Sequence, residues 1–272
     1  MKLRTVAFAL LACTLPAAAA LVASYDSGVA PVAGITGAAN PTSQGWTFNG
    51  VTTNNFAYAS DSTIGGWRVV DGTTTAFANY SQAIGAGDLA DMNNLGWVAE
   101  FTVAISQDAM SKAGGGVEGY YAGANSARQN NNAMWVESAS GATDYAYILS
   151  FATNATNDYL LKDSVNTYTI ATGNQLSSEL GTTNANYVTF TLEYTPGTGA
   201  YLTDSLGGDH GLIATFTGYT PSSDRVIWGS YSAGGQGGTV WNNVSLVTVP
   251  EPGTPLLLGM FLLLGLARRP RR

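Results

Sequence analysis

The chain has 272 residues, of which only 11% are charged, and its formal net charge is −7. This surplus of acidic groups argues against nucleic-acid binding, which needs a basic surface for phosphates. The single cysteine, Cys13, and the single histidine, His210, exclude a disulfide framework and a histidine-rich zinc site.

The N-terminus has the features of an export signal. Its first four residues carry two positive charges, residues 5–15 are mostly apolar and residues 16–20 are mostly small. This order is typical of a secretory signal peptide that enters the Sec translocon and is cleaved after Ala20. The alternative is a lipoprotein with lipid attached at Cys13. We assign residues 1–20 to the signal peptide, which is expected to be helical.

Residues 21–249 are predicted to form one exported domain. They hold 17 acidic and 5 basic residues, a net charge of −12, which suits a soluble extracellular protein. Apolar and polar residues alternate repeatedly with a period of two, which predicts half-buried strands. A short helix is expected at residues 87–92. The predicted strands are 45–48, 67–70, 96–106, 117–121, 133–137, 145–151, 159–162, 167–171, 186–195, 200–203, 212–217, 225–231 and 240–247.

Many strands separated by turn signals, with almost no helix, predict an all-β, two-sheet jelly-roll sandwich. A tryptophan-containing strand with an Asp-Gly turn spans residues 67–72, and a last strand at 240–244 closes just before the C-terminal tail. This pattern resembles the concanavalin A-like, laminin G-like jelly roll. The resemblance implies a concave sheet and rim loops that bind sugars in many relatives, often near a calcium ion.

Sugar sites combine aromatic platforms with polar side chains. Trp135 follows a polar run and is predicted to be the best exposed platform. Tyr120 and Tyr121 are further candidates, because adjacent residues of a strand face opposite ways. The other tryptophans with a clear strand pattern are expected in the core: Trp97, Trp228 and Trp241.

A calcium site is predicted at Asp88, Asp91 and Asn93, with Asn94 in the same cluster, because calcium prefers carboxylate and amide oxygens. Asp71 is a further candidate ligand. The alternative is a helix cap and turn, in which these side chains bond to their own backbone.

Few residues of the sequence are candidates for a catalytic site. A Ser–His–Asp triad would need His210, which lies in a glycine-rich turn where we expect an exposed, inert side chain. Glycoside hydrolysis needs two carboxylates about 5–10 Å apart. The glutamates on predicted strands each stand alone, although a pair from different strands remains open: Glu100, Glu118, Glu137 and Glu193.

The C-terminal tail, residues 250–272, has three parts in order. It begins with the triplet Pro250, Glu251 and Pro252, continues with the uncharged residues 255–267, and ends in arginines. A helix of 13 residues spans about 20 Å, short of the roughly 30 Å hydrocarbon core, so a temporary membrane stop is favoured over a single-pass anchor. The positive-inside rule keeps the terminal arginines in the cytoplasm: Arg268, Arg269, Arg271 and Arg272.

This tail resembles the PEP-CTERM sorting signal of Gram-negative bacteria. The resemblance implies transient insertion in the inner membrane, processing by exosortase, and a final place at the cell surface or outside the cell. It also implies a producer that makes extracellular polysaccharide. The sequence therefore favours a secreted, surface-sorted, non-enzymatic protein that is structural or adhesive in an exopolysaccharide matrix. A calcium-dependent carbohydrate-binding module is the alternative, and a glycoside hydrolase is less favoured.

Overall fold

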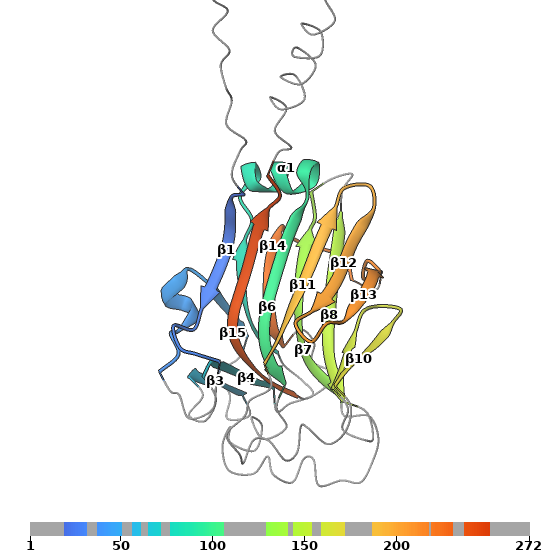
Figure 1. Cartoon of the computed structure of the whole chain (residues 1–272). Helices are drawn as coiled ribbons and strands as arrows, with labels where there is room; N and C mark the ends of the chain where they lie inside the picture. The colour runs from blue at the N-terminus through green and yellow to red at the C-terminus, as the bar shows by residue number, and fades with distance from the viewer. Residues whose placement is uncertain are drawn as a thin grey trace, which may run out of the picture.

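The computed structural model describes residues 19–31, 37–50, 56–60, 65–71, 77–105, 129–140, 144–153, 159–171, 187–217, 219–230 and 237–250. Within these ranges the chain forms two antiparallel sheets that pack face to face (Figure 1). The first sheet holds β1 (Leu21–Asp26), β3 (Phe56–Ser60), β4 (Trp67–Asp71), β6 (Trp97–Ile105), β11 (Val188–Thr195), β12 (Gly199–Asp204), β13 (Asp209–Ile213) and β15 (Gly237–Thr248). The second holds β2 (Thr47–Gly50), β5 (Ala78–Ala83), β7 (Gln129–Ser138), β8 (Tyr145–Thr153), β9 (Tyr159–Lys162), β10 (Thr167–Ala171) and β14 (Arg225–Ser230).

The described strands are ordered β13-β12-β11-β6-β15-β4-β3 in the eight-stranded sheet, where β1 also pairs with β15. The seven-stranded sheet runs β10-β9-β8-β7-β14-β5-β2. The central neighbours β11-β6, β6-β15, β7-β14 and β14-β5 are far apart in sequence, so each sheet forms only when distant segments meet. The predicted all-β, two-sheet jelly-roll sandwich is confirmed.

The core between the sheets is rich in aromatic rings. The ring of Trp228 lies at its centre, with ring centroids 4.7 Å from Tyr80, 5.1 Å from Tyr25 and 5.2 Å from Trp241. Burial of such large apolar side chains supplies most of the driving force for folding in a domain with no disulfide. The three tryptophans expected in the core are each 0% exposed: Trp97, Trp228 and Trp241.

One short α-helix, α1 (Ala86–Leu95), covers an end of the sandwich, and its side chains Leu89 and Met92 are buried. The helix ends at Gly96, whose N–H donates to the carbonyl of Met92 at 3.1 Å. Gly96 has a φ of 102°, and a Cβ there would collide with the carbonyl oxygen of Tyr194. Glycine is therefore required at this junction. The helix expected at residues 87–92 is confirmed.

Strands β1, β3 and β5 were not anticipated from the sequence, and β13 begins three residues before the predicted strand at 212–217. A 3-10 turn, η1 (Pro41–Gln44), precedes β2. The predicted strand at 117–121 and the two terminal helices lie outside the described residues. Among the described helices, none is long and apolar enough to cross a membrane.

Candidate functional site: the outer face of the seven-stranded sheet

Successive residues of a strand point to opposite faces of its sheet, so each strand of the sandwich has a core-facing and an outward-facing set. In the seven-stranded sheet, Tyr80, Trp228 and Met134 are paired neighbours that face the core. The residues between them point away from the core. We call this surface the outer face of the seven-stranded sheet, and its members on four adjacent strands are Thr47, Asn49, Asn79, Ser81, Arg225, Ile227, Trp135 and Glu137.

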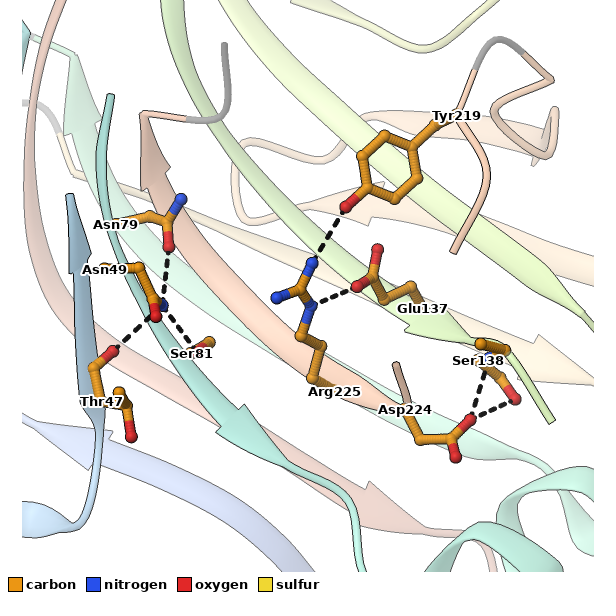
Figure 2. Close-up of polar contacts among 10 residues, drawn as sticks. Thr47, Asn49, Asn79, Ser81, Glu137, Ser138, Tyr219, Asp224 and Arg225 are labelled. Carbon is orange, nitrogen blue, oxygen red and sulfur yellow. Dashed lines mark hydrogen bonds and ion pairs between the residues drawn. The ribbon is translucent and has the colours of Figure 1, made fainter. Parts of the chain in front are cut away.

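Polar side chains on β2 and β5 form a connected network on this face, which we call the asparagine network (Figure 2). The Nδ2 group of Asn49 donates to Ser81 Oγ at 2.8 Å, to Asn79 Oδ1 at 3.1 Å and to the carbonyl of Thr47 at 3.3 Å. Asn79 in turn donates to the carbonyl of Ser230 at 3.0 Å. These bonds fix both amide groups. They leave Asn49 Oδ1 as an acceptor and the Ser81 hydroxyl hydrogen as a donor for an outside ligand.

A buried ion pair lies next to the asparagine network. The Nε group of Arg225 donates to Oε1 of Glu137 in a very short contact, and Nη2 donates to the hydroxyl of Tyr219 at 3.1 Å. Figure 2 shows the guanidinium group between this pair of partners and the two asparagines. Burial raises the pKa of Glu137, and Arg225 opposes that rise only in part. The Glu137 side chain is fully buried, whereas that of Arg225 is 27% exposed.

Trp135 occupies this face but is not an exposed platform. Its exposed fraction is 3%, and it packs in a small apolar cluster on which Phe216 and Tyr219 lie. The segment between β13 and β14 folds over it, held by a hydrogen bond of 2.6 Å from the Phe216 N–H to the carbonyl of Ala146. The predicted exposure of Trp135 is wrong because a segment some 80 residues away in the chain covers it.

Asp224 fixes the start of β14 against the end of β7, also in Figure 2. Its Oδ1 accepts from Ser138 Oγ and from the Ala139 N–H, each at 2.9 Å, and its Oδ2 accepts from Ser140 Oγ at 2.6 Å. Burial alone would raise the pKa of Asp224, but these hydrogen bonds outweigh it, so the pKa lies below its usual value. The Asp224 carboxylate therefore fixes the position of Arg225, the next residue in the chain, relative to the end of β7.

His210 is not the exposed side chain that its glycine-rich turn suggested. It is 13% exposed, and its Nε2 lies 2.6 Å from Oδ2 of Asp204. The other carboxylate oxygen of Asp204 accepts from the N–H groups of Leu206 and Gly208. Burial would raise the pKa of Asp204, yet the bonds from His210 and the backbone lower it. The interaction of Asp204 with His210 and with the backbone stabilises the turn between β12 and β13.

The predicted calcium ligands Asp88, Asp91 and Asn93 all lie on α1, where Asp88 and Asp91 are one helical turn apart. Within the described ranges, no three His, Cys, Asp or Glu side chains form a group that could hold a metal ion. Asp88 lies in the first turn of α1, where a carboxylate also stabilises the helix dipole. Calcium at these residues stays a prediction.

Each described glutamate stands alone on its strand, but two of them form a pair from different strands, as the sequence left open. In the register of β6 and β11, Glu100 lies opposite Thr191 and Glu193 lies opposite Val98, so the two are diagonal neighbours on the outer face of the eight-stranded sheet. Both side chains are exposed. Such diagonal positions are about 7–8 Å apart between Cα atoms. The other candidate site residues lie outside the part of the chain that the structure describes. They are Glu118, Tyr120, Tyr121, the side chain of Asp71, and the tail after Pro250.

The residues of the asparagine network were not singled out from the sequence. The alternation of Thr47, Phe48 and Asn49 was a usable signal for an outward polar face on β2. Nothing in the sequence paired Asn49 with β5 or Glu137 with Arg225, because these partners are 30 and 88 residues apart.

The fold is similar to those of solved proteins at low sequence identity. The carbohydrate esterase of the Shiga toxin-encoding bacteriophage phi24B aligns over 85% of this chain and 99% of its own, with 12% identity and a TM-score of 0.54. A sialidase of Trypanosoma rangeli aligns over 87% of this chain, which spans 32% of the sialidase, with 11% identity and a TM-score of 0.43. The seed lectin of Lotus tetragonolobus aligns over 76% of this chain and 94% of its own, with 10% identity and a TM-score of 0.38. The first likeness shows the fold alone, and the other two are too weak to carry an argument.

No curated protein sequence matches this chain. The PEP-CTERM protein-sorting motif matches residues 248–272, which begin at the last residue of β15 and include the predicted tail. This motif implies export, processing by exosortase, and a surface or extracellular location. The chain therefore carries a PEP-CTERM sorting motif directly behind a two-sheet β-sandwich.

Proposed function

We propose that this protein is a non-enzymatic, adhesive component of an extracellular polysaccharide matrix, and that it holds polysaccharide on the outer face of the seven-stranded sheet. The observation that carries the proposal is the asparagine network. Asn49 donates to Asn79 and to Ser81, and Asn79 donates to the carbonyl of Ser230, so the Asn49 amide oxygen and the Ser81 hydroxyl hydrogen are left for a ligand.

The chemistry of this network suits a polymer rich in hydroxyl groups. A sugar hydroxyl both donates and accepts, so it can bond to Asn49 Oδ1 and to Ser81 Oγ at once. Because the network already fixes the amide groups, little side-chain entropy is lost on binding. Each such bond contributes only about 0.5–1.5 kcal/mol, so one site binds weakly. Adhesion then depends on many copies bound along one polymer.

A non-enzymatic role agrees with the placement of the carboxylates. Glu137 is the glutamate on this face, and its carboxylate is fully buried against Arg225, where it cannot reach a sugar bond. Glu100 and Glu193 are exposed and lie on the opposite sheet, away from the proposed surface. The sorting motif supports the location, because it directs the domain to the outside of the cell.

The test uses the protein spanning residues 21–249 and the producer's own exopolysaccharide, with calcium and with chelator. We expect saturable binding in both conditions and no shortening of the polysaccharide. Asn49→Ala should weaken binding about 5-fold, the equivalent of about one hydrogen bond. The matched control is Asn243→Ala on the eight-stranded sheet, which should bind as the wild type does.

Other outcomes of this test would favour a different function or refute the proposed one. Binding lost in chelator would favour the calcium-dependent lectin and point to Asp88, Asp91 and Asn93. Shortened polysaccharide, abolished by Glu193→Gln, would favour a glycosidase. Equal binding by Asn49→Ala and the wild type would refute the proposed surface.

A further inference from the structure

Arg225 lies on the outer face of the seven-stranded sheet, on the strand next to the asparagine network. In the register of β14 and β5, Arg225 is opposite Ala83 and Ile227 is opposite Ser81. Arg225 and Ser81 are therefore diagonal neighbours, and such positions are about 7–8 Å apart between Cα atoms. Ala83 is exposed, and its methyl side chain is too short to cover the guanidinium group. A ligand held by Ser81 is thus within reach of the Arg225 side chain.

The guanidinium group of Arg225 has hydrogen-bond donors to spare. An arginine side chain carries five N–H hydrogens. One, on Nε, is donated to Glu137, and one, on Nη2, is donated to Tyr219. The other three, which include both hydrogens of Nη1, have no partner among the residues that the structure describes. In Figure 2 the guanidinium nitrogen without a dashed line lies on the side of the two asparagines, away from Glu137 and Tyr219.

The ion pair of Arg225 and Glu137 has its positive end outward. The Glu137 side chain is fully buried, whereas that of Arg225 is 27% exposed, so a group that approaches from solvent meets the guanidinium first. The neighbouring carboxylate of Asp224 is bound at the end of β7, where Ser138 and Ser140 donate to it. The outer face therefore presents a positive charge beside the neutral hydrogen-bonding groups of the asparagine network.

From this geometry we infer that the polysaccharide unit bound beside the asparagine network is a uronic acid, whose carboxylate binds the free N–H groups of Arg225. The hydroxyl groups of the same chain bind Asn49 Oδ1 and the Ser81 hydroxyl. This inference rests on the proposed carbohydrate surface. It adds the class of sugar that the surface takes and the residue that selects it.

The physical chemistry of the guanidinium group supports this selection. Its planar fork of N–H groups matches the two oxygens of a carboxylate, and such charge-assisted bonds are stronger than those to a neutral hydroxyl. Glu137 and Tyr219 already fix the group, so little side-chain entropy is lost on binding. The negative net charge of the domain repels an acidic polymer at long range. Physiological salt screens charges beyond about 8 Å, so the local charge of Arg225 decides the preference.

Calorimetric titration with two matched oligosaccharides tests the inference. The full chain is expressed in its own bacterium and purified after export. The probes are a β-1,4-linked tetrasaccharide of glucuronic acid and cellotetraose, which has the same backbone with a CH₂OH group in place of each carboxylate. Chelator is present throughout, so that no calcium ion bridges two carboxylates. We expect the acidic probe to bind at least about 5-fold more tightly, the equivalent of about one hydrogen bond to a charged group at a partly exposed site.

Two variants assign this preference to Arg225. The double variant Arg225→Gln with Glu137→Gln removes the guanidinium without leaving a buried charge unpaired, and its affinity ratio for the two probes should fall to about 1. The control is Lys162→Gln on β9, which removes one positive charge from a strand three positions away from β14. Its ratio should equal that of the wild type. Asn49→Ala should weaken both probes alike and so leave the ratio unchanged.

The outcomes separate this inference from the proposed function. Equal affinity of the wild type for both probes would overturn the choice of a uronic acid and leave the carbohydrate surface standing. Binding of neither probe would overturn both. A preference for the acidic probe that persists in the double variant, or that is lost in Lys162→Gln, would show that Arg225 does not select the sugar.

Discussion

Asp163, in the turn between β9 and β10, is expected to stabilise the domain more than any exposed aspartate. Its carboxylate is 9% exposed and accepts five hydrogen bonds. The N–H groups of Val165 and Asn166 donate at 2.6 and 2.5 Å, and the Asn166 amide donates at 3.1 Å. The Tyr168 hydroxyl donates at 2.6 Å and the Ala214 N–H at 3.2 Å. The last bond fixes the segment that covers Trp135.

The free energy of unfolding lost in Asp163→Ala depends on which of the five hydrogen-bond donors water can reach. Val165 and Asn166 are exposed, so water replaces the carboxylate there at little cost. Tyr168 and Ala214 are half-buried, and their bonds to a charged group contribute about 1.5–3 kcal/mol each. Taking the lower value for both bonds gives a loss of about 3 kcal/mol. For a domain of this size, that loss lowers Tm by about 6–12 °C.

Thermal unfolding followed by circular dichroism measures this loss. The matched control is Asp209→Ala, because Asp209 is exposed and its Oδ1 accepts one bond, from the Gly211 N–H at 3.0 Å. The control should lower Tm by no more than about 4 °C, the equivalent of about 1 kcal/mol. A fall for Asp163→Ala no greater than that of the control would refute the reasoning, since water would then replace all five bonds.

Three further predictions concern the same fold. Arg225→Met leaves the Glu137 carboxylate buried without its partner and should destabilise the domain by about 3–5 kcal/mol in urea unfolding, and adding Glu137→Gln should recover part of that loss. Gly96→Ala places a Cβ against the carbonyl of Tyr194 at a positive φ and should cost at least about 1–3 kcal/mol, whereas Gly87→Ala on the exposed start of α1 should not destabilise. The pKa values of Asp163, Asp204 and Asp224 are all lowered, because hydrogen bonds outweigh the effect of burial. Their stabilisation is complete above the unfolded pKa near 4 and is lost as pH falls through the lower folded pKa values, so Tm should drop as pH falls below about 4; a constant Tm under such acidic conditions would contradict this.

The sequence predicted those elements whose pattern repeats within one strand. Strands β6 and β11 alternate apolar and polar residues over their whole length, and their core-facing side was correctly assigned from Trp97. Strand β5 was missed because it contains one aromatic residue, Tyr80, and none of the β-branched residues that mark a strand. Strand β1 directly follows the small residues of the signal peptide and has only six residues of its own.

The candidate site was harder to predict because its contacts are made between distant segments. The burial of Trp135 depends on Phe216 and Tyr219, which lie in the segment before β14, the strand that pairs with β7. The exposure of Trp135 was predicted from the polar run that precedes it, and periodicity reports only which face of a strand a residue occupies. It does not report whether a later segment covers that face.

The most direct test of the proposed carbohydrate surface is an NMR titration of residues 21–249 with oligosaccharides cut from the producer's exopolysaccharide. The side-chain amide signals of Asn49 and Asn79 are compared with that of Asn243 on the opposite sheet. The account predicts saturable shifts of the first two signals and none of the third. Shifts confined to Asn243 and its neighbours, or no shifts at saturating oligosaccharide, would contradict it.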